Sequence, residues 1–421
     1  MKKQNVVNLS DGAYENAMTG LGIPGIDKNE DTRVSLSVNE PNYISLASQY
    51  AKDGIVGRLV DIPPLKALKS PITIVGDDEG TSFKELSSIG FFDSVTLAGK
   101  YARLFGGAIL ITLYDDGGQL ETAVPKNARV IGYRVFSPYR TPITMADISS
   151  DPASPFFNDV AMWNVDLRSG KRIRVHPSRV TLFKGNALCD PLDVSVRAQI
   201  FGISEIERVN ESIKKLAPAF GGLASMLQEN GICVFSLAGM NSLLASPDNG
   251  ANKINTRMSI VKRCMSSFRA VVQDTQDDFK QLALNFSGVP ESIKILMSYV
   301  ASQSGFPVSV LFGSTASGLS QTNEGDIRQL DDLVDQWRSA VLYAPMCSLI
   351  SDYRTRNDGA RQKSEFDFGA VSQMTVKEEA DLMTARVTAA NTLYEMGAVT
   401  SDEVRTAFVV NGASGSFSVE K

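Results

Sequence analysis

The chain offers few residues that could carry catalysis, and its only histidine is His176, in the segment His-Pro-Ser-Arg-Val. Histidine is the usual general base near neutral pH, and a two-histidine phosphodiesterase needs a pair of them. One histidine therefore excludes that class of enzyme. Because His176 stands where a strand is expected to meet a turn, we interpret it as a structural residue that forms hydrogen bonds.

Patterns that bind nucleotides or metals are also weak. Residues 20–25 match G-x-G-x-x-G, but Pro24 interrupts the motif and no strand is expected before it, so we interpret this segment as part of an arm. The sequence contains neither the phosphate loop G-x-x-x-x-G-K-[ST] nor the serine-hydrolase motif G-x-S-x-G. We expect no catalytic residue, no metal and no cofactor. A nuclease that holds Mg²⁺ with carboxylates alone remains the alternative.

The most distinctive pattern runs from Ser304 to Asp326. Pro307 and a β-branched run lead to Phe312-Gly313, and small uncharged polar residues follow with no acid or base until Glu324. A long segment without periodicity between periodic segments is usually functional or disordered. Its polar members are Ser314, Thr315, Ser317, Ser320, Gln321 and Asn323.

Charge limits the role that nucleic acid can have. The 42 Lys and Arg against 47 Asp and Glu give a net charge of −5, without the basic excess of a protein that grips DNA tightly. Five basic residues nevertheless cluster at Arg168, Lys171, Arg172, Arg174 and Arg179. Five acidic residues cluster at Glu324, Asp326, Asp331, Asp332 and Asp335. We interpret the basic cluster as a solvated hairpin, with a DNA or motor contact as the alternative.

The elements that must position these residues follow from periodicity and from turn residues. Apolar residues at helical spacing predict helices at 55–62, 206–227, 255–270, 290–303, from 327 through 341, and after 377. We expect Pro63-Pro64 to end the first helix and Pro218 to kink or break the second. Strands are predicted at 108–114 and 172–176, each next to a glycine turn, and Thr400 to Glu403 form a capping box. The irregular alternation predicts an α+β fold.

Composition indicates a large globular protein with more than one domain. The chain has 421 residues, of which 43% are hydrophobic and 21% charged. No apolar run reaches the roughly 18 residues that span a bilayer, and the N-terminus lacks the apolar region of a signal peptide. The four cysteines have no C-x-x-C spacing, so we expect free thiols in a reducing compartment.

The segment 304–326 resembles the portal proteins of tailed bacteriophages, in a subfamily first described as a domain of unknown function. Four other stretches resemble the same subfamily in the same order: 55–63, 101–111, 176–185 and 345–349. The resemblance covers roughly residues 45 to 350. It implies a ring of about twelve identical chains at one vertex of the capsid.

The resemblance also implies a division of the chain into wing, stem, clip and crown. An N-terminal arm would take residues 1–44, and an α/β wing residues 45–204. A helical stem and a small clip would lie within 205–311, and a candidate tunnel loop within 312–326. A long helix that returns to the wing would take 327–370, and a helical crown 371–421.

The function implied by the resemblance is a structural one, without catalysis. The ring would be the conduit for packaging and ejection of double-stranded DNA, and the docking platform for the terminase large subunit and the head–tail adaptor. Its other partners would be the major capsid or scaffolding protein, with no membrane. It would be assembled in the host cytoplasm and become part of the virion. The competing hypotheses are a phage enzyme that cleaves nucleotides or phosphodiesters, and a monomeric DNA-binding module.

Two sets of residues follow as candidates within that architecture. The six polar residues from Ser314 to Asn323 would face DNA, because such side chains contact phosphate without the counterion release that holds DNA in place. Arg172 and Arg174 would pair with acids of a neighbouring chain among Asp331, Asp332 and Asp335.

Overall fold

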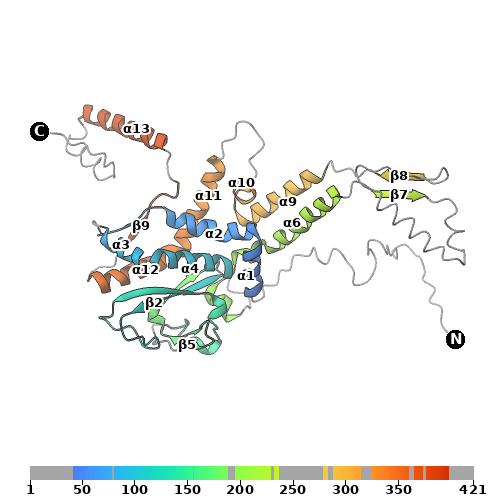
Figure 1. Ribbon diagram of the computed structural model, residues 1–421. Helices are drawn as coiled ribbons and strands as arrows, with labels where there is room; N and C mark the ends of the chain where they lie inside the picture. The colour runs from blue at the N-terminus through green and yellow to red at the C-terminus, as the bar shows by residue number, and fades with distance from the viewer. Residues whose placement is uncertain are drawn as a thin grey trace, which may run out of the picture.

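The computed structural model describes residues 41–77, 80–154, 156–187, 195–228, 232–236, 278–282, 288–313, 324–359, 365–372 and 376–397. A helical layer covers one face of a small sheet, and a pair of long helices projects from one side of this body (Figure 1). The predicted α+β class is confirmed. Residues 1–40 of the arm predicted at 1–44, the loop 314–323, the predicted helix 255–270 and the capping box at Thr400 lie outside the described residues.

The body begins with two helices whose N-termini are capped by side chains. Asn42 accepts from the N–H of Ser45 ahead of α1 (Tyr43–Lys52), and Asp53 accepts from the N–H of Ile55 ahead of α2 (Gly54–Lys69). These bonds satisfy N–H groups that the first turn of a helix leaves without partners. The other helices of the layer are α3 (Thr81–Ser88), α4 (Phe91–Phe105), α11 (Glu324–Trp337) and α12 (Tyr343–Tyr353).

The prediction that Pro63-Pro64 ends the first helix was wrong, since α2 continues to Lys69. Pro63 has no N–H for the carbonyl of Leu59, four residues earlier in the helix. The buried Arg103 of α4 replaces this donor, because its Nε lies 2.8 Å from the Leu59 carbonyl oxygen. Gly99 lets α4 approach, since a Cβ there would lie 3.3 Å from Pro64. A residue of another helix therefore compensates for the proline.

The central sheet has the antiparallel strand order β3-β2-β6. The predicted strand at 108–114 is confirmed as β2 (Gly107–Tyr114), between β3 (Val130–Phe136) and β6 (Val180–Lys184). Alternate residues of β2 enter two cores: Leu110 faces the helical layer, and Ile109 faces the second core around Trp163. Burial on both faces explains why this strand is almost entirely apolar, with Thr112 as a buried polar exception.

The second core lies under a hairpin of β4 (Trp163–Asp166) and β5 (Arg172–Val175). This confirms the strand predicted at 172–176, and Gly170 supplies the turn with a φ of 81°. Helix α5 (Val196–Phe201) closes this core with Phe201, which is fully buried.

The projecting pair consists of α6 (Glu205–Gln228) and α9 (Val289–Ser304), which confirms both predicted helices. Pro218 was predicted to kink or break α6, but the helix continues beyond it. Pro218 is exposed, so water can satisfy the carbonyl that loses its helical donor. The antiparallel strands β7 (Ile232–Ser236) and β8 (Asp278–Leu282) lie beyond the outer ends of the two helices (Figure 1).

The C-terminal part returns to the body before leaving it again. A π-helical turn, Arg338–Leu342 (η5), joins α11 to α12, and a second π turn, Arg354–Asp358 (η6), follows α12. Strand β9 (Phe366–Phe368) then pairs antiparallel with β1 (Ile72–Ile74), and α13 (Val376–Glu395) stands away from the body (Figure 1). The predicted helix after residue 377 is confirmed.

Candidate nucleic-acid interface

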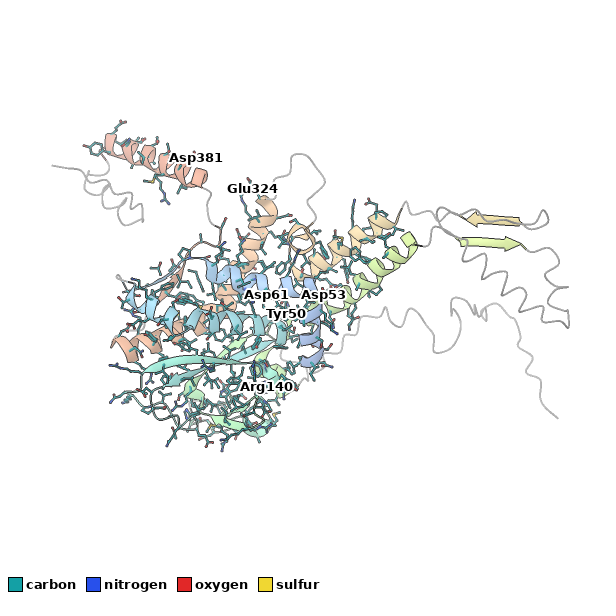
Figure 2. The ribbon with its side chains drawn as sticks, in the orientation of Figure 1. Tyr50, Asp53, Asp61, Arg140, Glu324 and Asp381 are labelled. Carbon is teal, nitrogen blue, oxygen red and sulfur yellow. The ribbon has the colours of Figure 1, made fainter. Side chains whose placement is uncertain are left out.

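The two ends of the candidate tunnel loop lie on short, well-anchored elements. Helix α10 (Val308–Phe312) ends at Gly313, whose φ is 70°, and α11 begins at Glu324 on the other side of the loop. Glu324 lies at the tip of α11, next to the loop (Figure 2). The six candidate residues between Ser314 and Asn323 lie outside the described residues, so their part in a DNA contact stays a prediction.

Arg58 of α2 holds the last turn of α10. Its Nη1 donates to the carbonyl oxygens of Leu311 at 2.8 Å and Val310 at 3.2 Å. The final carbonyls of a helix have no helical donor and carry the negative end of the helix dipole. A guanidinium therefore suits this position both as a donor and as a positive charge.

A direct bond joins the two flanks of the loop. The hydroxyl of Ser309, in α10, donates to Oδ2 of Asp326, in the first turn of α11. Glu324 and Asp326 also place negative charge at the positive end of the α11 dipole. This end of the loop is acidic, which disfavours tight binding of phosphate there.

The anchor rests on buried side chains. Phe306 is 2% exposed, and the guanidinium of Arg103 lies 5.8 Å from its ring centroid and from that of Trp337. Burial lowers the pKa of Arg103 to about 10, and the charge of Glu205 opposes that shift. Arg103 therefore stays charged near neutral pH, and cation–π contacts with two rings stabilise it.

The candidate acids on α11 differ in whether they form an ion pair within the same chain. Asp331 is buried and pairs with Lys66 of α2, and Asp335 pairs with Arg338, the first residue of η5. Asp332 is exposed. An intersubunit pair involving Asp331 or Asp335 would have to compete with a partner in the same chain.

The two candidate arginines of the hairpin also differ in whether they form an ion pair within the chain. Arg172 donates to both carboxylate oxygens of Asp166, at 2.7 and 3.1 Å, and this contact lowers the pKa of Asp166. Arg174 is exposed on the same strand. The hairpin and α11 lie at opposite ends of the body (Figure 1), so the proposed pairing needs a second chain. That pairing stays a prediction.

The expectation that the whole basic cluster is solvated was wrong for Arg179. Its side chain is buried, pairs with Asp116, donates to the Thr122 carbonyl at 2.9 Å and lies 5.6 Å from the ring of Tyr114. Arg179 belongs to the core, because a buried charge persists when it is both paired and hydrogen-bonded.

His176 has the structural role expected from the sequence. Its Nδ1 accepts the N–H of Ser178 at 3.2 Å and lies 2.9 Å from the Ser178 hydroxyl, at the start of the turn Pro177–Arg179. Burial, helped by the charge of Arg179, lowers the pKa of His176. Among the described residues, no group of three or more His, Cys, Asp or Glu side chains could hold a metal ion.

Arg58 and Ser309 were not predicted from the sequence as residues that anchor the loop. Arg58 is the one charged residue in the apolar run from Gly54 to Val60, and this was the available signal. Ser309 gave no signal, because its partner is 17 residues away on another helix.

The model of the phage portal protein family matches residues 44–392. The chain belongs to the phage portal protein family. The match includes the anchored ends of the loop, the hairpin and nearly all of α13. Among the helices in the described ranges, none combines the length and the hydropathy that a membrane span requires.

Solved structures of low sequence identity share the portal fold. The neck of a native gene transfer agent particle, computed with C12 symmetry, has a TM-score of 0.57 at 13% identity, over 88% of this chain and 94% of that one. A chain from the virion of the native gene transfer agent has a TM-score of 0.56 at 14% identity, over 90% of this chain and 96% of that one.

Curated relatives share sequence over much of the chain. The protein named Anti-CBASS protein Acb1 of Sphingomonas paeninsulae is 24% identical over 398 residues, which are 92% of this chain and 63% of that protein. A protein of the same name from Caulobacter sp. (strain RHG1) is 22% identical over 71% of this chain and 49% of its own length. The chain thus spans about half to two thirds of these relatives.

Proposed function

We propose that the chain forms a ring of about twelve copies at one capsid vertex and is a conduit for double-stranded DNA. The observation that carries this proposal is the portal family match over residues 44–392, together with a fold shared with a neck computed with C12 symmetry. The ring would also be the platform for the terminase large subunit, the head–tail adaptor and the major capsid or scaffolding protein. Assembly in the host cytoplasm would precede its incorporation into the virion.

The elements suggest how the chain would divide within the ring. The sheet β3-β2-β6 and the β4–β5 hairpin would form the wing (45–204), and α6 and α9 the stem, with β7 and β8 as the clip (205–311). Residues 312–326 would be the tunnel loop, 327–370 the long helix with its return to the wing, and 371–421 the crown. Residues 1–44 would be the N-terminal arm. What supports this division is the separation of these units in the described chain.

The mass of the purified full-length protein tests the assembly. Native mass spectrometry should give a closed ring of about twelve chains. A monomer at micromolar concentration would contradict the proposal, because a conduit needs a closed ring.

Packaging by reconstituted rings tests the loop. Replacing Ser317 and Ser320 with arginine should slow DNA packaging and leave the ring mass unchanged, because added positive charge retains phosphate. The matched control places the same two charges at Gln119 and Ser169, which are exposed on the proposed wing. Normal packaging by the loop variant, or equal slowing by the control, would contradict a DNA-facing loop.

We further infer that the hairpin takes part in assembly through its exposed arginine. Arg174 and Asp332 remain the best cross-subunit candidates, since Arg172, Asp331 and Asp335 have partners in their own chain. Such a pair contributes about 0–1 kcal/mol, repeated at each interface. Rings should then loosen in high salt, and Arg174→Glu should be rescued by Asp332→Arg. Rings that are insensitive to salt would count against this contact.

A further inference from the structure

Helix α13 (Val376–Glu395) has almost no contact with the rest of the described chain. No other described element packs extensively against it, and its described side chains are exposed except that of Ala390, which is half-buried. Figures 1 and 2 show the helix, with Asp381 labelled, standing clear of the body. Most of the stability of a helix in a protein comes from the packing of its apolar face against other elements. A stable α13 therefore needs a packing partner.

One side of α13 needs no partner. The hydroxyls of Thr384, Thr388 and Thr392 donate to the carbonyl oxygens four residues earlier, at 2.8, 2.8 and 2.9 Å. Asp381 and Asn391 lie on the same arc of the helix, by the rotation of about 100° per residue. This polar side can face solvent with its hydroxyl groups satisfied.

A first apolar row lies along another side. Its members are Ala380, Met383, Val387, Ala390 and Tyr394, at the alternating spacing of three and four residues that is typical of a packing seam between helices. Met383 is 38% exposed, Val387 41% and Tyr394 56%. The two alanines leave room for a neighbouring helix to approach closely.

A second apolar row consists of Leu382, Ala389 and Met396, spaced by seven residues. Leu382 is 36% exposed and Met396 is 75% exposed. At about 100° per residue, the two rows lie about 140° apart around the helix. In a two-fold pair, each helix packs against one neighbour and buries one apolar row. In a closed ring of about twelve copies, each helix has two neighbours, and the directions to them differ by about 150°.

We propose that α13 packs between two other copies of itself, with the Met383 row of one chain against the Leu382 row of the next. The inference rests on the proposed ring, in which each chain has a different neighbour on each side. Both rows are then buried, and the threonine side faces solvent.

Cross-linking in the full-length protein tests this arrangement. We compare Val387→Cys, Ala389→Cys and the double variant after treatment with a short bismaleimide, and the parent chain gives the background from the native cysteines. The double variant should give a ladder of linked chains, because each chain joins the next, and neither single variant should exceed the parent. Dimers formed by Val387→Cys alone would indicate a two-fold seam and overturn the proposal. Absence of a ladder in the double variant would also overturn it.

Amide exchange gives a second readout with a matched control. Val387→Asp should speed exchange within α13 at least tenfold, and Thr388→Asp on the polar side should leave it close to the parent value. Equal effects of the two variants would overturn the proposal. Native mass spectrometry of the same samples distinguishes failure of the proposed function from failure of the α13 packing. If the parent protein forms no ring, the proposed function is contradicted. An intact ring without cross-links contradicts only the packing of α13.

Discussion

Arg103 shows how one residue can connect two helices that sequence patterns treat separately. It lies in α4 and is 6% exposed, yet it donates to the Leu59 carbonyl that Pro63 leaves without a helical donor. Its guanidinium also forms cation–π contacts with the rings of Phe306 and Trp337, which lie at the base of the loop. The side chain therefore links the integrity of α2 to the base of the candidate tunnel loop.

A double-mutant cycle tests this compensation. Arg103→Met should lower the free energy of unfolding by about 1–3 kcal/mol, because it leaves a buried carbonyl without a donor. In a Pro63→Ala background the cost should be smaller, since the introduced alanine supplies the helical N–H. The two changes should therefore be non-additive in thermal or urea unfolding. Strict additivity would contradict the proposed role of Arg103.

The raised pKa of Glu207 should make the free energy of unfolding depend on pH. Burial in the first part of α6 raises its pKa from 4.5 to about 6. The folded state therefore holds the proton more tightly than the unfolded state, and stability falls as pH rises from about 4.5 through 6. Glu207→Gln should raise stability by up to about 2 kcal/mol above pH 7 and change it little below pH 4.5.

The control for this prediction is Glu211→Gln, four residues further along the same helix. Glu211 is half-buried and forms a surface pair with Lys214 at 3.2 Å, so its loss should have little effect at any pH. A stabilisation by Glu207→Gln that does not depend on pH would show that burial of its charge is not the cause.

At the scale of elements, two of the family-like stretches meet where α4, β6 and α5 converge. The N–H of Gly185, at the end of β6, lies 2.8 Å from the carbonyl oxygen of Gly106 and 3.0 Å from that of Phe201. Gly106 has a φ of 85°, which favours glycine. The stretches 101–111 and 176–185, separated in sequence, thus form one backbone junction beside the central sheet.

Gly185→Ala should disrupt this junction. An added Cβ would lie 2.4 Å from the Gly106 carbonyl oxygen, which is backbone and cannot rotate away. We expect a loss of several kcal/mol, or failure to give soluble protein, in a thermal unfolding assay. Gly132→Ala, in β3, is the control, because nothing lies within 4 Å of its Cβ position. Wild-type stability of Gly185→Ala would mean that the three elements do not meet in this way.

The whole molecule combines a packed body with described elements that extend away from it. Two cores enclose the central sheet, while α6 and α9 project from the body and α13 stands clear of it. Ile295 and Tyr299 of α9 are 69% and 46% exposed, so the projecting pair also presents apolar surface. Exposed apolar surface of this kind indicates contacts with other chains.

We expect no hydrolysis of ATP, cyclic nucleotides or DNA by the assembled protein. Its one histidine is part of a turn, and the candidate carboxylates on α11 are paired or exposed on a helix rather than gathered in a pocket. Purified rings incubated with labelled substrates and Mg²⁺ or Mn²⁺ should show no turnover. Turnover that survives repurification and disappears when a specific Asp or Glu is replaced would overturn the structural role.

Features that depend on local order can be predicted from the amino-acid sequence. The α+β class, the buried strand β2, the helices α6, α9 and α13, and the structural role of His176 all follow from spacing, turn residues and the number of histidines. The motif from Ser304 to Asp326, with four similar stretches, was enough to indicate the portal family. These signals are readable because each of them lies within a short segment.

The environments of individual charges and prolines depend on contacts between elements, and they became known from the fold. Arg179 is buried and pairs with Asp116, and Arg172 pairs with Asp166. Helix α2 continues past Pro63, where Arg103 of α4 donates to the Leu59 carbonyl. The partners in these contacts are 63, 6 and 44 residues apart in sequence. A charge or a carbonyl is satisfied by whatever the fold brings beside it, and the pattern around a single residue does not contain that information.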